Sequence, residues 1–227
     1  MVLVSKYSRY DPLRNNLLKI AAKSFLLGAV TTGAVVMEFS QPQCIPVCIY
    51  IQCLCLFHSL EFVATYVFNN TQVDDDSFIL EDKEFHMITA LSLLEHWLTP
   101  EYLKIPTVVR LVGLLSIASG QIARTLSMYT ARESFNHYVQ QSGKKSHTLV
   151  TTGIYSYIRH PSYFGFFVWF IGMELLLRNV ATLAIGSVIL WKFFKDRIRY
   201  EEKFLINMFQ DSYIKYRATT RTWMLIE

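Results

Sequence analysis

The sequence is poor in charged residues, in proline and in glycine. Only 18% of its 227 residues are Asp, Glu, Lys or Arg, against about 25% in soluble domains, while 52% are hydrophobic. This balance argues against an ordinary soluble enzyme and against intrinsic disorder. Six prolines and nine glycines are too few for a fibrous or low-complexity chain. The net charge of +4 is too small to indicate a nucleic-acid partner.

Conventional nucleotide-binding and hydrolase motifs are also missing. The chain has no G-x-G-x-x-G after a strand, no Walker loop, no H-E-x-x-H and no G-x-S-x-G. It has no internal repeat and no linker rich in Ser or Gly, so we expect one domain over residues 1–227. A cofactor site would therefore have to be built from helices and from the loops at their ends.

The four cysteines lie in one apolar run, at Cys44, Cys48, Cys53 and Cys55. A metal site needs nearby histidines or a second cysteine pair, and the run has neither, so we predict no metal. We expect buried, reduced thiols that behave as small apolar residues. Lipidation and weak metal binding are the alternatives.

Six apolar segments predict an all-α, polytopic membrane helix bundle. A hydrocarbon core of about 30 Å needs a helix of about 20 mostly apolar residues. The predicted spans are about six in number, at 17–37, 44–68, 85–98, 106–123, 163–177 and 180–194. Residues 195–217 are charged, with aromatic residues at helical spacing, which predicts an amphipathic C-terminal helix on the membrane surface.

The lysines and arginines predict one orientation, because positive charge collects in cytoplasmic loops. Residues 1–23 hold five lysines and arginines, residues 124–162 hold five, and the chain from Lys192 onward holds eight. Only three lysines and arginines fall on the opposite side of the membrane in this arrangement. Both termini and the loop 135–163 are therefore expected to face the cytoplasm. The glycosylation sequon that begins at Asn69 would be cytoplasmic as well, where it carries no sugar.

The polar stretch from His147 to Gly165 is the densest group of residues able to do chemistry. Pro161 fits the first turn of a helix, whose free N–H groups and positive dipole attract a carboxylate. Tyr155 and Tyr163 offer flat faces for a ring, and Gly165 permits close approach of a ligand. The same residue types also suit an anchor at the level of the lipid headgroups, so spacing alone leaves both interpretations open.

A second candidate pair follows the last predicted span. Arg197 and Glu201 are four residues apart and share one face of a helix. The alternative is a surface ion pair, worth about 0.3–0.5 kcal/mol. Arg124, at the end of the fourth predicted span, is a candidate for binding substrate, with membrane anchoring as the alternative.

Three stretches together resemble the isoprenylcysteine carboxyl methyltransferase family, enzymes of the endoplasmic reticulum that methylate the C-terminal prenylated cysteine of CaaX-processed proteins. They are FNHYVQ at 135–140, HTLVTTGIYSYIRHPSYFGFF at 147–167 and WKFFKDRIRYEE at 191–202. The resemblance extends over about residues 57–216. Sterol-type NADPH reductases and phospholipid methyltransferases are similar around R-H-P-x-Y and E-E, and they are the alternatives.

The resemblance implies S-adenosylmethionine as the methyl donor and prenylated CaaX-type proteins, such as small GTPases and lamins, as substrates. The residues that it implies around the donor are Gln140, His147, Thr148, Leu149, Val150, Tyr155, His160, Pro161, Ser162, Tyr163 and Glu201. It implies that Arg197 meets the substrate, and Arg197 and Glu201 are the expected catalytic pair. The chain departs from the family in two ways: it lacks two N-terminal spans of the longer members, and residues 219–227 lack the usual proline.

Overall fold

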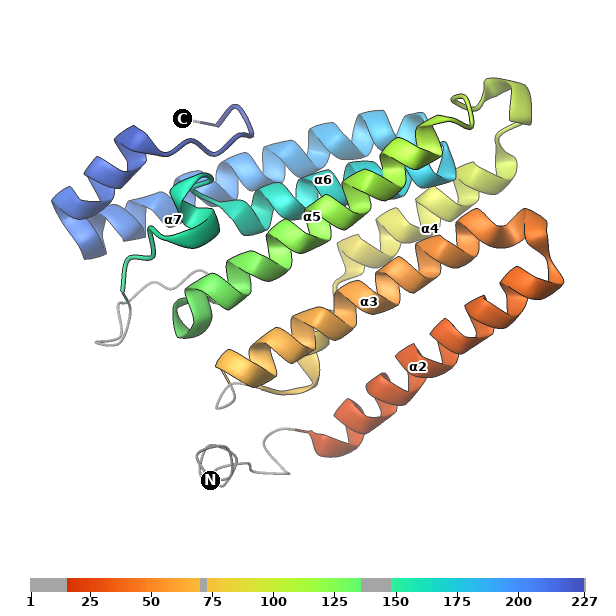
Figure 1. The fold of residues 1–227 in the computed structure, drawn as a ribbon, viewed down its shortest axis with the longest axis horizontal. Helices are drawn as coiled ribbons and strands as arrows, with labels where there is room; N and C mark the ends of the chain where they lie inside the picture. The colour runs from red at the N-terminus through yellow and green to blue at the C-terminus, as the bar shows by residue number, and fades with distance from the viewer. Residues whose placement is uncertain (1–15, 70–72, 136–147, 227) are drawn as a thin grey trace. The chain divides into compact units, whose positions relative to one another are not determined.

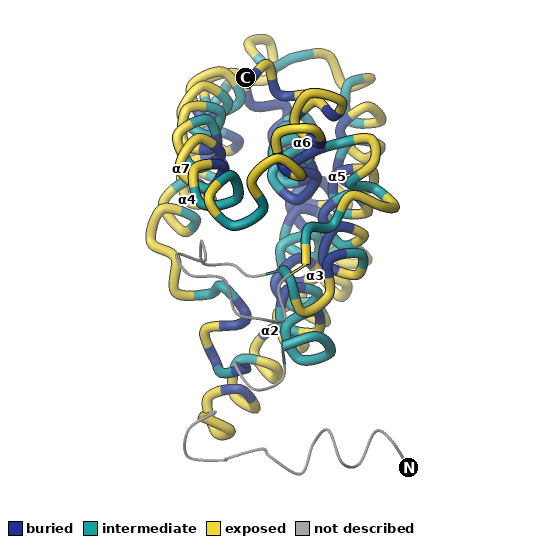
Figure 2. Tube along the Cα trace, turned by 90° about the vertical axis from the view of Figure 1, so that its left-hand side faces the viewer, coloured by how far each residue is buried: buried dark blue, intermediate teal, exposed yellow. Residues whose placement is uncertain are grey.

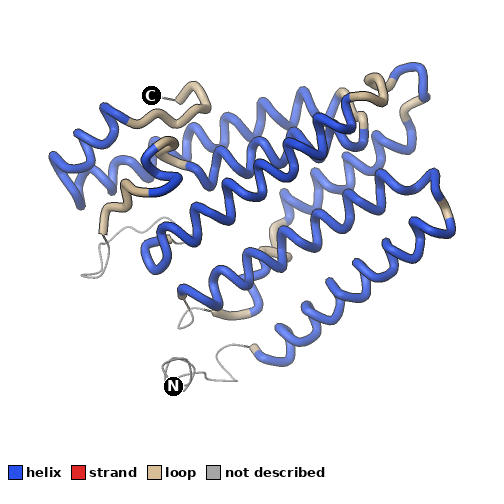
Figure 3. The backbone as a smooth tube through the Cα atoms, in the orientation of Figure 1, coloured by secondary structure: helices blue, strands red, loops and turns tan. Residues whose placement is uncertain are grey.

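The computed structural model describes residues 16–69, 73–135 and 148–226, and these form helices and loops without any strand (Figures 1 and 3). The helices are α2 (Leu17–Ser40), α3 (Ile45–Phe68), α4 (Lys83–Leu98), α5 (Val109–Ala131), α6 (Pro161–Leu177) and α7 (Ala181–Thr219). The chain divides into two compact units, one of Met1–Lys104 with Leu176–Asn179 and one of Ile105–Leu175 with Val180–Glu227. The predicted all-α fold class is confirmed.

Among the described helices, three stretches are long and apolar enough to cross a membrane. They are Leu17–Ser40, Pro42–Phe68 and Val109–Ser134. The apolar helix α6 is shorter, with 17 residues. Most of α2 is exposed (Figure 2), which suits a helix whose apolar side chains face lipid. The arrangement in six spans stays a prediction.

The first unit is built on the packing of α2 against α3. Ile20 and Leu27 of α2, Cys55 of α3 and Phe78 of a short turn form one buried cluster. None of the four cysteines forms a disulfide, in agreement with the predicted thiols. Three of the four are buried, as expected of small apolar residues in a helix interface.

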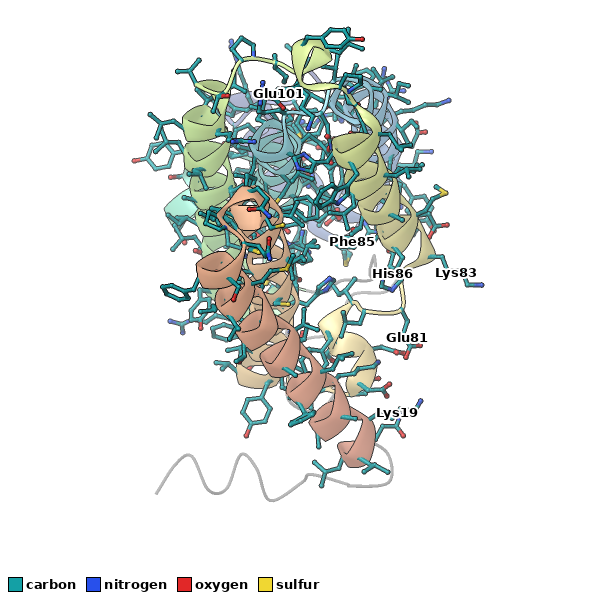
Figure 4. All side chains as sticks on the ribbon, turned by 90° about the vertical axis from the view of Figure 1, so that its right-hand side faces the viewer. Lys19, Glu81, Lys83, Phe85, His86 and Glu101 are labelled. Atoms are coloured by element: carbon teal, nitrogen blue, oxygen red, sulfur yellow. The ribbon has the colours of Figure 1, made fainter. Side chains whose placement is uncertain are left out.

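Asp75 anchors the turn Asp75–Phe78 to the start of α2. Its buried carboxylate accepts hydrogen bonds from Lys23 Nζ at 2.9 Å and from Asn16 Nδ2 at 2.7 Å. Burial alone would raise the pKa of Asp75, but the bonds from Lys23 and Asn16 outweigh it and lower the pKa below its usual value. Lys19 and Glu81, labelled in Figure 4, lie around this polar corner.

In the second unit α5 and α6 touch backbone to backbone at glycines. The glycines are seven residues apart on each helix: Gly113 and Gly120 on α5, and Gly165 and Gly172 on α6. A Cβ atom on Gly120 would lie 2.5 Å from the backbone nitrogen of Trp169, and one on Gly165 would lie 2.7 Å from that of Arg124. The expectation that Gly165 admits a ligand is therefore wrong, because the space beside it is filled by α5.

The helix α7 joins two elements that the sequence predicts as separate. In place of a span over 180–194 and a second helix over 195–217, α7 (Ala181–Thr219) is helical without interruption from Ala181 to a kink at Gln210, whose backbone is non-helical, and helical again after it. Residues 187–219 contain neither proline nor glycine, so nothing in the sequence ends the helix where its apolar half gives way to its charged half. The charged candidates Arg197 and Glu201 therefore lie on an uninterrupted part of α7.

Candidate active site

The first turn of α6 and the middle of α7 bring three polar side chains together. The Tyr163 hydroxyl donates to Oε2 of Glu201 at 2.7 Å and accepts from Nε of Arg197 at 2.9 Å. The Arg197 guanidinium also lies 5.6 Å from the centre of the Tyr163 ring, within range of a cation–π contact. Helical spacing predicted that Arg197 and Glu201 are neighbours, but it could not predict that a tyrosine from another helix links them.

His160 lies beside the same tyrosine and between two glutamates. Its ring stacks on that of Tyr163, with centroids 5.7 Å apart and an angle of 9° between the planes. Its Nδ1 atom is 3.8 Å from Glu201 Oε2, and its Nε2 atom is 3.2 Å from Glu202 Oε1. Three residues expected around the donor, His160, Tyr163 and Glu201, therefore lie together.

Glu202 belongs to a buried cluster of charges next to this group. Its carboxylate lies 2.6 Å from Nε of Arg159 and 3.4 Å from Nε of Arg217. Burial alone would raise the pKa of Glu202, but the hydrogen bond and charge of His160, followed by those of Arg159, lower it to about 2. Glu202 is therefore ionised at neutral pH and balances the buried Arg159.

The start of α6 receives a further cation from α5. Because α6 begins at Pro161, the N–H groups of Ser162 and Tyr163 in its first turn have no acceptor within the helix, whereas that of Phe164 donates to the carbonyl oxygen of His160 at 3.1 Å. Ser162, in that turn, accepts a hydrogen bond from Nη1 of Arg124 at 3.1 Å. Arg124 is buried and lies 5.3 Å from the centre of the Phe166 ring. It lies inside α5, which continues to Ala131, and not at the helix end that the sequence predicted.

The chain before α6 carries the other residues expected around the donor. Gln140 and His147 lie outside the described residues. Thr148 is exposed, and Leu149 and Val150 are half-buried in a stretch without regular structure.

Tyr155 lies in the short turn Gly153–Ser156, which we call the η5 turn. Gly153 has a φ of 58°, a left-handed conformation that favours glycine at the start of this turn. Burial raises the pKa of Tyr155, and the nearby charge of Glu201 raises it further. The phenol is therefore neutral at physiological pH, and its side chain is hydrogen-bonded with Ser127.

Sequence reasoning assigned no role to Arg159, Glu202 or Arg217, although all three form the buried cluster beside the site. One signal was available. Adjacent residues on a helix point about 100° apart, so Glu201 and Glu202 point in different directions, and His160 lies between them. The Glu202 carboxylate points toward further cations, Arg159 and Arg217.

The residues that the structure brings together fit S-adenosylmethionine, the donor implied by the resemblance. This molecule carries an ammonium group and a carboxylate, and a methyl group on a positively charged sulfur. The Glu201 carboxylate, with a side chain 28% exposed, suits the cationic groups. His160 and the free N–H groups at the start of α6 suit the carboxylate. The Tyr155 ring offers a flat apolar contact, whereas the Tyr163 ring is stacked on His160 and Phe194.

Comparison with known proteins identifies the family. The model of the isoprenylcysteine carboxyl methyltransferase (ICMT) family matches residues 111–207. The chain is 39% identical over 217 residues to protein-S-isoprenylcysteine O-methyltransferase of Saccharomyces cerevisiae, covering 91% of this chain and 90% of the relative. It is 36% identical over 209 residues to the Homo sapiens protein of the same name, covering 90% and 73%.

A solved structure, described as the eukaryotic intramembrane Ras methyltransferase isoprenylcysteine carboxyl methyltransferase, matches with a TM-score of 0.84. The identity is 30%, and the match covers 89% of this chain and 74% of that one. These likenesses confirm the resemblance and favour a carboxyl methyltransferase over a sterol-type reductase or a phospholipid methyltransferase. The chain, an integral membrane enzyme, belongs to the isoprenylcysteine carboxyl methyltransferase family.

Proposed function

We propose that the chain transfers the methyl group of S-adenosylmethionine to the C-terminal carboxylate of a prenylated cysteine, with the acceptor at Arg197 and the donor at Glu201. The observation that carries this assignment is the Tyr163 hydroxyl, which is hydrogen-bonded to both residues. A tyrosine shared in this way keeps two binding groups at a fixed separation. In-line transfer requires such fixed positions for its two reactants.

The acceptor needs no general base, because a C-terminal carboxylate is already ionised at neutral pH. The donor supplies a methyl group on a positively charged sulfur, and transfer leaves a methyl ester and a neutral thioether. Opposite charges on the two reactants disappear in this reaction, so exclusion of water favours the transition state over the separated ions. Arg197 orients the carboxylate through part of its planar fork while its Nε atom stays bonded to Tyr163.

The donor side of the site would be formed by the loop before α6 and by Glu201. His160 and the backbone N–H groups of Ser162 and Tyr163 would hold the carboxylate of S-adenosylmethionine. Glu201 would hold its ammonium group or its ribose. Tyr155 would contact its flat parts. Gln140, His147, Thr148, Leu149 and Val150 are assigned to the same ligand by the family motif alone.

Arg124 would act on the acceptor side as a second cation. It is held by Ser162 and by the Phe166 ring, so its position is fixed before substrate arrives. An arginine pair, Arg124 and Arg197, would attract the carboxylate of a prenylated cysteine. The prenyl chain is apolar and would enter from the bilayer, whereas the donor would enter from water.

The proposed substrates are CaaX-processed proteins such as small GTPases and lamins, and the proposed location is the membrane of the endoplasmic reticulum. The distribution of lysine and arginine supports an orientation with both termini and the site on the cytoplasmic face.

A methyl-transfer assay tests this proposal directly. The purified chain in lipid vesicles is incubated with radiolabelled S-adenosylmethionine and either N-acetyl-S-farnesylcysteine or phosphatidylethanolamine. We expect label only in the farnesylcysteine ester, which base releases as methanol. Label in phosphatidylethanolamine, or no label with either acceptor, would contradict the proposal.

A further inference from the structure

The segment after α7, residues 220–226, is packed against the site and is not a free end. It folds back alongside α7 in Figure 1, where it is dark blue. Met224 is 4% exposed and Ile226 is 5% exposed, and both belong to a cluster with Phe194 and Ile198 of α7. Between them Leu225 is 96% exposed. The Trp191 indole donates to the carbonyl oxygen of Met224 at 2.7 Å, which ties the segment to α7.

The end of α7 and this segment also hold the loop that precedes α6. Three alternate residues of that loop are bonded through their backbone. The carbonyl oxygen of Tyr155 accepts from the hydroxyl of Tyr216 at 2.7 Å, and that of Tyr157 accepts from the Trp223 indole at 3.0 Å. The N–H group of Arg159 donates to the carbonyl oxygen of Arg221 at 2.9 Å.

The side chain of Arg159 strengthens the same connection. Its Nη1 atom donates to the carbonyl oxygens of Arg217, at 3.2 Å, and Thr220, while its Nε atom pairs with Glu202. The last carbonyl groups of a helix have no partner within the helix, and here a buried guanidinium supplies one. Arg159, which directly precedes His160, therefore joins the loop to α7 and to the segment 220–226.

The backbone of the segment is strained at two points. Trp223 and Leu225 have φ values of 59° and 57°, which residues other than glycine rarely adopt. Such conformations persist only where the surrounding contacts fix them. At Trp223 and Leu225 they let Thr222, Met224 and Ile226 all point inward.

We propose that residues 220–226 hold the loop 153–160 in the conformation that binds the methyl donor, with Arg159 as the positioning residue. The proposal rests on the assignment of that loop to S-adenosylmethionine made above. It gives the segment, which has no proline, a definite role: it acts through hydrogen bonds and through the two buried anchors Met224 and Ile226.

Three variants of the full chain test this. Trp223→Phe keeps an aromatic ring and removes the N–H group that binds Tyr157. Met224→Ala removes a buried anchor, and Leu225→Ala is the matched control at an exposed neighbour. Loss of one neutral hydrogen bond corresponds to about a threefold effect, so we expect Trp223→Phe to raise the KM for S-adenosylmethionine about threefold. Met224→Ala should raise it further. Trp223→Phe should leave the KM for N-acetyl-S-farnesylcysteine within about twofold. Leu225→Ala should change neither constant.

Amide hydrogen exchange of residues 153–160, measured without donor, gives a readout that does not depend on activity. Trp223→Phe and Arg159→Lys, which keeps the charge beside Glu202 but loses the planar fork, should both speed this exchange, while Leu225→Ala should not. Wild-type exchange and wild-type KM for the donor in both variants would overturn the proposal. If the unmodified chain transfers no methyl group, the proposed function fails, and the exchange data still decide whether the segment holds the loop.

Discussion

The Tyr163 hydroxyl accepts a hydrogen bond from Nε of Arg197, 2.9 Å away, and donates one to Oε2 of Glu201 at 2.7 Å. Arg197 and Glu201 lie on α7, whereas Tyr163 comes from the first turn of α6. One hydroxyl group thus sets the position of the proposed acceptor and donor residues relative to the start of α6. A variant that lacks this hydroxyl group therefore tests the positioning of Arg197 and Glu201 without removing a charge.

Tyr163→Phe should lower kcat about 10- to 100-fold, because hydrogen bonds to two charged groups are lost and Arg197 can then reorient. The aromatic ring that stacks on His160 remains, so the protein should stay folded. Steady-state methylation of N-acetyl-S-farnesylcysteine measures the effect. Tyr200→Phe, on the exposed side of α7, is the control and should be neutral. A kcat for Tyr163→Phe within twofold of wild type would remove this hydroxyl from the account.

Acid should destabilise the fold through Glu202. Its pKa is lowered from 4.5 to about 2 in the folded protein, so its contribution to stability is present above the unfolded pKa and is lost as pH falls from about 4.5 toward about 2. Glu202→Gln should lower the thermal unfolding midpoint at neutral pH, since Arg159 loses its buried partner. The same variant should flatten the dependence of that midpoint on pH in the acidic window. If the unfolding midpoint of the wild type and of Glu202→Gln depended equally on pH in this window, Glu202 would not be the source of the acid sensitivity.

Gly120→Ala should destabilise the protein by about 1–3 kcal/mol, as expected where a close-packed interface is overfilled. The added Cβ would lie 2.5 Å from backbone of α6 at Trp169, so the two helices must move apart. Gly28→Ala on α2 is the control, because a Cβ there meets nothing within 4 Å. Unfolding in detergent micelles should show a lower free energy of unfolding for Gly120→Ala and no loss for Gly28→Ala. Equal stability of both would contradict the close contact at α5 and α6.

The helices were predictable from the sequence because long apolar stretches leave few alternatives. The positions of Pro161, at the start of α6, and of Arg197 and Glu201, one turn apart, followed from local rules. The continuation of α7 past residue 194 did not, because a change in hydrophobicity along a sequence does not by itself end a helix. What ends a helix is its backbone, and α7 has neither proline nor glycine there.

The contacts between distant parts of the chain could not be predicted. Arg159 and Glu202 are 43 residues apart, and their pairing depends on how α7 lies beside the loop before α6. The role of Gly165 was misjudged for the same reason: a glycine permits close approach, but the sequence does not say whether a ligand or a helix approaches. The packing of Met224 and Ile226 likewise requires the tertiary fold.

The central claim is that Arg197 holds the acceptor and Glu201 the donor within one site. Titration calorimetry with S-adenosylmethionine, carried out on Arg197→Ala and Glu201→Ala beside wild type, tests it most directly. Both variants should lose methylation of N-acetyl-S-farnesylcysteine, with Arg199→Ala, exposed on the same helix, as the active control. The account predicts that Arg197→Ala still binds the donor with near wild-type affinity and that Glu201→Ala does not. Loss of donor binding in Arg197→Ala together with its retention in Glu201→Ala would contradict the account.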